Sequence, residues 1–581
     1  MDNKILKLFI EKGFLLDNDM LNFLNELKDE GVANEIIDKI AIVSQQKLIT
    51  KSLVDKNLEK IKPILFGLEE EKKKLVEKYF VNVSVSVEVK KEVTIEQTEE
   101  VLESDSKNSI KVLSSPVLAS QKLTVKDFVK NFRNRYNFIK GILQNNTELE
   151  SLTSIDKITG NIRNFSVIGI VTDKRITKNK NLILDIEDLT GKIKVLINFD
   201  KEEIFEKSKE ILLDDVVGFK VSGTREILFC NDLFYPDCTL TEKHKTDEEV
   251  YALFISDMHL GSKNFLEKNF SKFIDWLNGI GCDEKQKQTL KKIRYLFVVG
   301  DSVDGVGAYP GQEKDLKIKE IKGQYEKLAE FYRRIPKHIS IIQCAGQHDA
   351  VRVAVPQPPL GEEFAKPLTE IENLYLVSNP SLIEVGGKPD KPGIKVLMYH
   401  GAGVIPHVIN EIEELRVSKA QATPAKAMKH LLLRRHLAPC HGGFVYIPNK
   451  DSDPMLIKEI PDIITTGDLH RSDIDKYNGV LIISNSCWQT QTAFEEKVGN
   501  QPDLCKVPVL NLKSGQIKIL DFVDEEDVKK DVEKKEEIKE QRKKYRKINK
   551  EKIRDKKKIW KREERSKRKE VRKSLDFLCR E

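Results

Sequence analysis

Residues 251–261 read YALFISDMHLG, and this stretch decides the fold of the central part of the chain. Residues 252–255 form an apolar run typical of a buried strand, which ends directly on Ser-Asp-Met-His at 256–259. Alternate residues of an extended chain point the same way, so Asp257 and His259 can reach one metal ion. Since an isolated motif of this kind is more often a turn, the rest of the chain must be considered.

The same construction recurs at other strand-like runs. They are 293–299 before Gly300-Asp301, 338–344 before Gly346-Gln347-His348-Asp349, 394–399 before His400-Gly401, and 462–466 before Gly467-Asp468-Leu469-His470. Open α/β sheets collect their ligands and catalytic groups at the carboxyl ends of strands. The recurrence therefore predicts one site built from several strand ends.

The side chains at these strand ends are carboxylates, amides and imidazoles, which suit two divalent ions such as Mn²⁺, Mg²⁺, Fe²⁺ or Zn²⁺. Of these, Mn²⁺ is the first expectation. Two ions bridged by one carboxylate can activate water and stabilise the charge on a phosphate that is attacked in line. A histidine that binds neither ion would protonate the leaving oxygen.

Composition indicates a large protein without a membrane anchor. The 581 residues are 39% hydrophobic, which predicts several domains with ordinary cores. No apolar run approaches the roughly 18 residues that span a bilayer, and the N-terminus is charged throughout, so we expect a soluble cytoplasmic protein with no membrane contact. The eight cysteines include no CxxC pair, which predicts reduced thiols rather than structural zinc.

The chain before the central part changes character twice. Residues 1–80 carry apolar residues at helical spacing, which predicts a small helical domain. Residues 81–120 are rich in valine, glutamate, lysine and serine without a stable period, and we interpret them as a flexible linker.

Residues 121–248 predict a helix followed by a small barrel. Five strand-like runs, with a helical piece at 201–209 between the third and fourth, are typical of an OB fold. Four basic residues are predicted in the loop between the first two strands, where they could bind a single strand of nucleic acid: Lys174, Arg175, Lys178 and Lys180. A structural barrel that docks another subunit is equally compatible with this pattern.

The strand-end motifs DxH, GD, GxHD, HG and GxxH, in this order, resemble those of the calcineurin-like metallophosphoesterase superfamily. Closer strings resemble the small subunits of archaeal family D DNA polymerases over residues 1–523. They are GDSVDG at 300–305, AYPGQE at 308–313, GQHDAVRVAVPQPPL at 346–360, RRHLAPCHGG at 434–443 and SNSCWQTQT at 484–492.

This resemblance implies a multidomain α+β protein. Its parts would be a helical N-terminal domain, an OB-fold β-barrel, a metallophosphoesterase β-sandwich flanked by helices over 249–523, and a charged tail over 524–581. The resemblance also implies a 3′–5′ proofreading exonuclease that acts on single-stranded 3′ ends of DNA and forms a heterodimer with a large polymerising subunit. The alternative is a scaffold subunit whose phosphoesterase fold has lost its chemistry.

The resemblance also implies ligand sets for two metals. The first metal would be held by Asp257, His259, Asp301 and His470, with Asp301 bridging to the second. His400 would hold the second metal together with two residues that depart from the family pattern. They are Gln347, where the family usually has asparagine, and Asp468, where it usually has histidine.

The GxHD motif implies further roles. His348 would be the catalytic acid, and Asp349 would orient the His348 ring and raise its basicity. We interpret Asp304 as a turn residue. Other residues in the family-like strings could contact nucleic acid or simply pack: Tyr309, Gln312, Arg352, Gln357, Trp488 and Gln489.

The C-terminal tail is strongly charged. Residues 541–573 contain 19 basic and 5 acidic residues, so the rest of the chain is mildly acidic. Such blocks are usually solvated helix or disorder, although a basic arm that contacts phosphates is the functional alternative. The end SLDFL, at 574–578, weakly resembles a peptide that binds a sliding clamp.

Overall fold

The computed structural model describes residues 15–16, 48–49, 109–118, 122–524 and 540. The chain divides into two compact units, Met1–Ile95 and Glu96–Glu581. In the first unit, β1 (Leu15–Leu16) pairs in parallel with β2 (Leu48–Ile49). Apart from these two short strands, the helical domain predicted over 1–80 lies outside the described residues. The charged tail predicted over 524–581 also lies outside them, apart from residues 524 and 540.

Two sheets form the centre of the second unit. Their strands are β3 (Ile110–Ser114), β9 (Tyr251–Ile255), β10 (Ile293–Val299), β11 (Ser340–Cys344), β12 (Leu374–Val377), β13 (Ser381–Val385), β14 (Ile394–Met398), β15 (Ile463–Thr466), β16 (Asp473–Tyr477), β17 (Val480–Ser484), β18 (Lys506–Asn511) and β19 (Ile517–Asp521). One six-stranded sheet has the order β12-β11-β10-β9-β18-β19, and the other has the order β16-β17-β15-β14-β13-β3. The strands predicted to carry the site are confirmed, and they are divided between the two sheets.

The two sheets pack face to face, and we call them, with their covering helices, the sandwich. Alternate side chains of β9 show how: Ala252 and Phe254 belong to an apolar cluster with Val396 and Met398 of the other sheet. Leu253, their neighbour, points to the opposite face and packs in a separate cluster. A strand that is buried on both faces has no polar position, which explains the continuous apolar run in the sequence.

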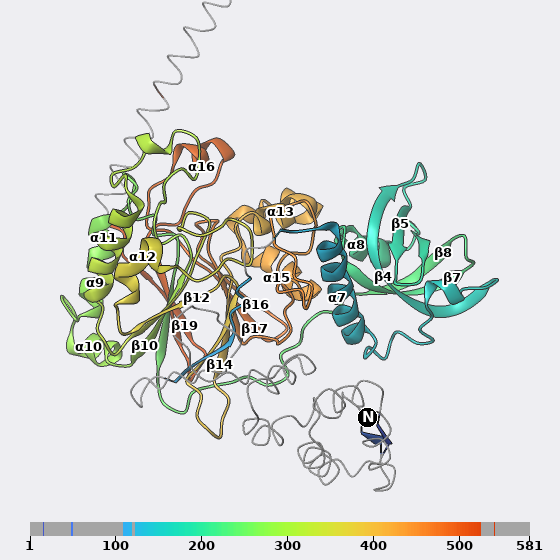
Figure 1. The fold of residues 1–581 in the computed structure, drawn as a ribbon, viewed down its shortest axis with the longest axis horizontal. Coiled ribbons are helices and arrows are strands. Elements are labelled where there is room, and N and C mark those ends of the chain that lie inside the picture. Colours follow the sequence, from blue (N-terminus) through green and yellow to red (C-terminus); the bar gives the residue numbers. More distant parts are fainter. Residues whose placement is uncertain (1–14, 17–47, 50–108, 119–121, 525–539, 541–581) are drawn as a thin grey trace, which may run out of the picture. The chain divides into compact units, whose positions relative to one another are not determined.

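Helices cover the outer face of each sheet (Figure 1). Those on the β9 sheet are α9 (Glu267–Leu277), α10 (Glu284–Leu290), α11 (Ile321–Arg333) and α12 (Glu362–Thr369). Those on the β14 sheet are α13 (Val404–Glu411), α14 (Glu413–Val417) and α15 (Ala425–Arg434). Short α16 (Ala493–Val498) follows the loop that leaves β17.

The predicted linker over 81–120 is wrong for residues 110–114. These residues form β3, which pairs antiparallel with β13 at the edge of a sheet. Ile110 is buried against the sandwich. The segment IKVLS is rich enough in apolar residues to add a strand, but its partner lies about 270 residues later, so no local pattern identifies it.

A closed five-stranded barrel lies between β3 and β9 in the chain. Its strands are β4 (Ile162–Ile176), β5 (Leu182–Glu187), β6 (Lys192–Ile197), β7 (Val216–Gly223) and β8 (Leu228–Phe234), in the order β4-β5-β6-β8-β7. Helix α7 (Val125–Leu143) precedes the barrel and α8 (Glu202–Lys209) connects β6 to β7. Among the described residues, no helix is both long and apolar enough to cross a membrane.

Helix α7 contacts both the barrel and the sandwich. Its Tyr136 hydroxyl donates to the carbonyl of Ile168 in β4, at 3.1 Å. Its Arg135 guanidinium donates to Asp453 of the sandwich at 2.9 Å, and both side chains are buried. A second buried ion pair joins Asp215 of the barrel to Arg434 of α15.

Candidate metal centre

The predicted ligands come from strand-end loops with an unusual backbone. Five of them have left-handed φ angles between 47° and 69°: Asp257, His259, Asp301, Asp468 and His470. For residues with a Cβ atom this conformation costs about 1–2 kcal/mol each. The loops hold one another in place, since His259 donates its backbone N–H to the carbonyl of Asp301 at 3.1 Å. Strain of this kind is concentrated at functional sites.

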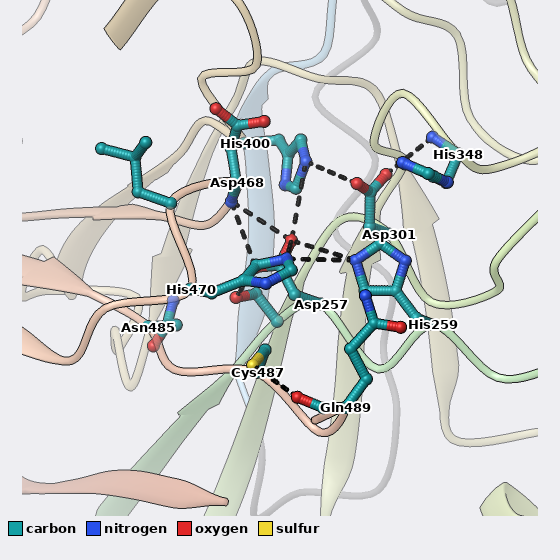
Figure 2. A network of polar contacts seen from close by, with 12 residues as sticks. Asp257, His259, Asp301, His348, His400, Asp468, His470, Asn485, Cys487 and Gln489 are labelled. Carbon is teal, nitrogen blue, oxygen red and sulfur yellow. Dashed lines mark hydrogen bonds and ion pairs between the residues drawn. The ribbon is translucent and has the colours of Figure 1, made fainter. Parts of the chain in front are cut away.

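The first group of ligands is Asp257, His259 and His470, which come from β9 and β15 (Figure 2). The Nε2 atoms of His259 and His470 lie 3.1 Å apart. Asp257 Oδ1 lies 3.4 Å from His470 Nε2 and 3.9 Å from His259 Nε2. All three side chains are buried, so their converging nitrogen and oxygen atoms form a donor set suited to a transition-metal ion.

The second group is Asp257, Asp301 and His400. His400 Nε2 lies 3.2 Å from Asp301 Oδ2 and 3.9 Å from Asp257 Oδ1. This nitrogen is buried and has no hydrogen-bond partner among the described residues, which fits a metal ligand. Asp257 belongs to both groups, whereas the resemblance implies Asp301 as the bridging residue.

Contacts behind the ligands hold the imidazoles with Nε2 turned inward. His400 Nδ1 contacts the carbonyl of Val299 at 2.8 Å, and His470 Nδ1 contacts Glu495 Oε1 at 2.8 Å. An acceptor on Nδ1 keeps the proton there and leaves Nε2 free to bind a metal. The sequence did not predict the role of Glu495. Its only signal is a capping box with Thr492 at the start of α16.

Asp304 has a larger role than the predicted turn. Its Oδ1 atom lies 3.2 Å from His259 Nδ1, and its carbonyl lies 2.8 Å from His348 Nδ1. Asp304 therefore orients the His348 ring through its carbonyl, and its carboxylate lies at ion-pair distance from His259. The local sequence GDSVDG gives no sign of this, because the contact depends on how the loop after β10 turns back.

The predicted role of Asp349 is wrong. Its carboxylate accepts hydrogen bonds from the Ser302 hydroxyl at 2.6 Å and from the Gly346 backbone N–H at 2.8 Å. His348 is instead oriented by the Asp304 carbonyl. Adjacent residues in a turn point to different sides. Asp349 therefore links the loop after β11 to the loop after β10, while His348 faces the site.

The two residues that depart from the family pattern contact each other. Gln347 Nε2 donates to Asp468 Oδ1 at 3.0 Å. The backbone N–H of Asp468 also approaches Asp257 Oδ2 at 3.1 Å. The structure therefore brings both altered residues to one side of the second group. Their amide and carboxylate oxygens are harder donors than imidazole nitrogen.

Glycines allow the loops to approach so closely. A Cβ atom on Gly300, which has a φ of 78°, would lie 2.5 Å from His400 Nδ1. A Cβ atom on Gly467 would lie 2.6 Å from Asp257 Oδ2. Any larger residue at either position would displace a predicted ligand.

The pKa values show how strongly the buried charges interact. Burial raises the pKa of Asp468 to about 6, and the neighbouring Asp257 and Asp301 add to this effect. Burial lowers the pKa of His400, but Asp301 and Asp257 outweigh it and raise that pKa to about 10. A cluster of acids and imidazoles with such shifts is typical of a functional site.

The four predicted nucleic-acid-binding residues belong to the barrel, at the end of β4 and in the turn that follows it. Strand β4 continues to Ile176, so Lys174 and Arg175 end this strand rather than lying in the loop. Lys174 Nζ is also used internally, since it donates to the carbonyl of Ile211 at 2.8 Å. Lys178 and Lys180 do lie in the turn, and Lys180 Nζ lies 5.2 Å from the centre of the half-exposed Phe199 ring.

Comparison with known proteins identifies the family of this chain. A family model that describes the B subunits of DNA polymerases alpha and epsilon matches residues 252–474. The DNA polymerase II small subunit of Archaeoglobus fulgidus is 31% identical over 503 residues, which are 86% of this chain and 93% of that protein.

Two further relatives carry the same name. The protein of Methanothermobacter thermautotrophicus is 37% identical over 68% of this chain and 79% of its own length. The protein of Pyrococcus furiosus is 39% identical over 69% of this chain, and the match spans 64% of that relative, just under two thirds of its length. On this evidence, the chain belongs to the family of archaeal DNA polymerase II small subunits.

Proposed function

We propose that this chain is a metal-dependent 3′–5′ exonuclease that removes nucleotides from single-stranded 3′ ends of DNA and binds a large polymerising subunit. The observation that carries the proposal is the intact donor set. Three buried histidines turn Nε2 toward Asp257 or Asp301, and the Nδ1 atom of each lies 2.8–3.2 Å from an acceptor. Strained backbone is concentrated at functional sites, so strained loops that carry a complete donor set favour an active centre over a scaffold.

The residues present fit two divalent ions. Asp257, His259 and His470 would hold the first, and Asp301 and His400 would hold the second with Gln347 and Asp468. Bound there, the ions would activate water and neutralise charge on the phosphate. Mn²⁺ is the expected metal, because the donor set mixes imidazole with carboxylate and amide.

His348 is proposed to protonate the leaving group. Its Nδ1 atom is held by the Asp304 carbonyl, which leaves Nε2 for proton transfer. Burial lowers the pKa of His348, but Asp301 and the Asp304 carbonyl outweigh it, so the net pKa is raised and the protonated ring is available. Water would add to phosphorus, the bond from phosphorus to the 3′-oxygen would break, and that oxygen would take the proton.

We propose that residues 121–248 are a helix plus an OB fold that guides the DNA strand, and that 249–523 are the metallophosphoesterase domain. The supporting observation is the turn after β4, which contains Lys178 and Lys180 and where Lys180 lies near the ring of Phe199. Basic residues beside an aromatic ring can hold a single strand through phosphate contacts and base stacking. Arg175, at the end of β4, extends the same basic edge.

The test is cleavage of 5′-labelled DNA by the purified full-length chain, alone and with its large subunit. Single strands and primer–templates with a 3′ mismatch should be shortened one nucleotide at a time with Mn²⁺ and remain intact with chelator. Asp257→Asn, which keeps the size of a ligand in both groups, should be inactive. If neither the chain nor the complex shows metal-dependent cleavage that Asp257→Asn removes, the scaffold alternative is correct.

A further inference from the structure

The side chain of Gln489 is buried beside the first ligand group. It is 3% exposed, and its Oε1 atom is inaccessible and has no hydrogen-bond partner among the described residues. Figure 2 shows its carboxamide beside the His259 ring, with the amide nitrogen nearest the ring, and a half-turn of the terminal amide would place Oε1 there instead. Buried polar groups in proteins are nearly always paired, so an unpaired one here indicates a missing partner.

The backbone around Gln489 is fixed to the strand-end loop that carries Asp257 and His259. Trp488 donates its backbone N–H to the carbonyl of Asp257 at 3.0 Å. The backbone of Gln489 pairs with that of Phe265 in an isolated antiparallel β-bridge. The thiol of Cys487 donates to the Gln489 backbone carbonyl at 3.3 Å. The position of the carboxamide is therefore set by the same contacts that set the ligands.

Two neighbours with unpaired buried atoms have simpler explanations. The indole of Trp488 packs among phenylalanines in the core under α9, including Phe270 at 5.0 Å between ring centres. Asn485 leaves Oδ1 unpaired, but its Nδ2 atom donates to Thr465 Oγ1 at 2.9 Å and to the Thr466 carbonyl at 2.8 Å, which fixes the side chain against the end of β15. Gln489 differs because its side chain ends at the ligand group rather than in the apolar core.

We propose that Gln489 is an additional residue that holds the divalent ion of the first group, together with Asp257, His259 and His470. A carboxamide oxygen is a neutral, hard donor, which suits ions such as Mn²⁺ and Mg²⁺. This inference rests on the metal assignment of the proposed function. It adds a residue that the implied ligand set does not include.

Calorimetric titration of Mn²⁺ into the chelator-treated full-length chain tests this directly, without any measurement of activity. Gln489→Met keeps the length of the side chain but removes its polar atoms, and should weaken Mn²⁺ binding at one of the two sites by roughly 10–100-fold. Gln489→Glu, which still offers an oxygen, should recover the affinity. Gln491→Met is the matched control, because the Gln491 carboxamide donates to the carbonyl of Asn500 instead.

The outcomes separate this inference from the proposed function. Equal Mn²⁺ affinity in wild type and Gln489→Met would overturn the role of Gln489 and leave the metal site in place. Loss of affinity that Gln489→Glu does not recover, or that Gln491→Met shares, would also overturn it, since the effect would then be general damage to the loop. A wild-type chain that binds no Mn²⁺ would overturn both this inference and the metal assignment of the proposed function.

Discussion

Replacement of Asp453 by asparagine should strongly destabilise the second unit, because Asp453 neutralises a buried arginine. Asp453 Oδ2 accepts from Arg135 Nε at 2.9 Å and from Asn131 Nδ2 at 3.0 Å, and it lies 2.9 Å from His436 Nε2. The side chains of Arg135 and Asp453 are 2% and 1% exposed. Asparagine keeps the shape but leaves the guanidinium without a counter-charge.

The expected loss of unfolding free energy follows from the burial of the Arg135–Asp453 pair rather than from the distance between its charges. Breaking a buried ion pair by removing one charge typically costs about 3–5 kcal/mol, whereas surface pairs contribute little. The pair Lys337–Glu372 is the matched control, since its charges are 3.0 Å apart but 83% and 79% exposed. Glu372→Gln should leave the free energy of unfolding unchanged within error.

The assay is chemical unfolding of the full-length chain, followed through the fluorescence of Trp488, which is buried under α9, and of Trp276, a partly buried residue of α9. Burial raises the pKa of Asp453, but His436 and Arg135 outweigh it, so its net pKa is well below the ordinary value. The stabilisation is therefore complete above about pH 3.9 and is lost as the pH falls below that value. The free energy of unfolding of Asp453→Asn should lack the part that the wild type loses at acid pH. If Asp453→Asn lowers the free energy of unfolding by less than about 1 kcal/mol, or by no more than Glu372→Gln does, the buried pair does not stabilise the fold as argued.

Three further predictions concern the site. Asp301→Ala should lower nuclease activity by several orders of magnitude while thermal unfolding and binding of the large subunit stay unchanged; substantial residual cleavage would contradict its role in two-metal chemistry. His348→Ala should slow the chemical step by roughly 10²–10⁴-fold with Mn²⁺ binding intact, as measured by single-turnover kinetics and calorimetry, and a parallel fall in metal occupancy would identify it as a ligand. Gln347→Asn with Asp468→His should shift metal preference toward softer ions such as Mn²⁺, Fe²⁺ or Zn²⁺ in metal titrations, and an unchanged metal profile would show that neither residue contacts the ion.

The strands that carry the site were predictable, because each is an apolar run that stops on a polar group. The runs predicted at 252–255 and 293–299 are observed as strands over Tyr251–Ile255 and Ile293–Val299. A strand buried on both faces must be apolar throughout, so its end is visible in the sequence. The types of ligand were predictable as well, because a carboxylate or imidazole at a buried strand end must be paired or bind a metal ion.

The contacts around the ligands were not predictable from local sequence. Asp304 and Glu495 hold the rings of His348 and His470, although nothing nearby in the chain marks them. Asp349 follows His348 directly, yet its carboxylate turns to Ser302. Side-chain direction in a tight turn depends on φ and ψ, which the whole set of loops decides together.

The sequence by itself determined where the buried strands end and which chemical groups stand there, because burial permits few polar residues and each of them is conspicuous. The tertiary structure alone decided that Asp257 lies in both ligand groups, that Gln347 meets Asp468, and that β3 joins the edge of a sheet. These pairings join residues about 120 to 270 positions apart. Their geometry is fixed by how two sheets pack and by how glycine-containing loops turn, and no stretch of sequence contains that information.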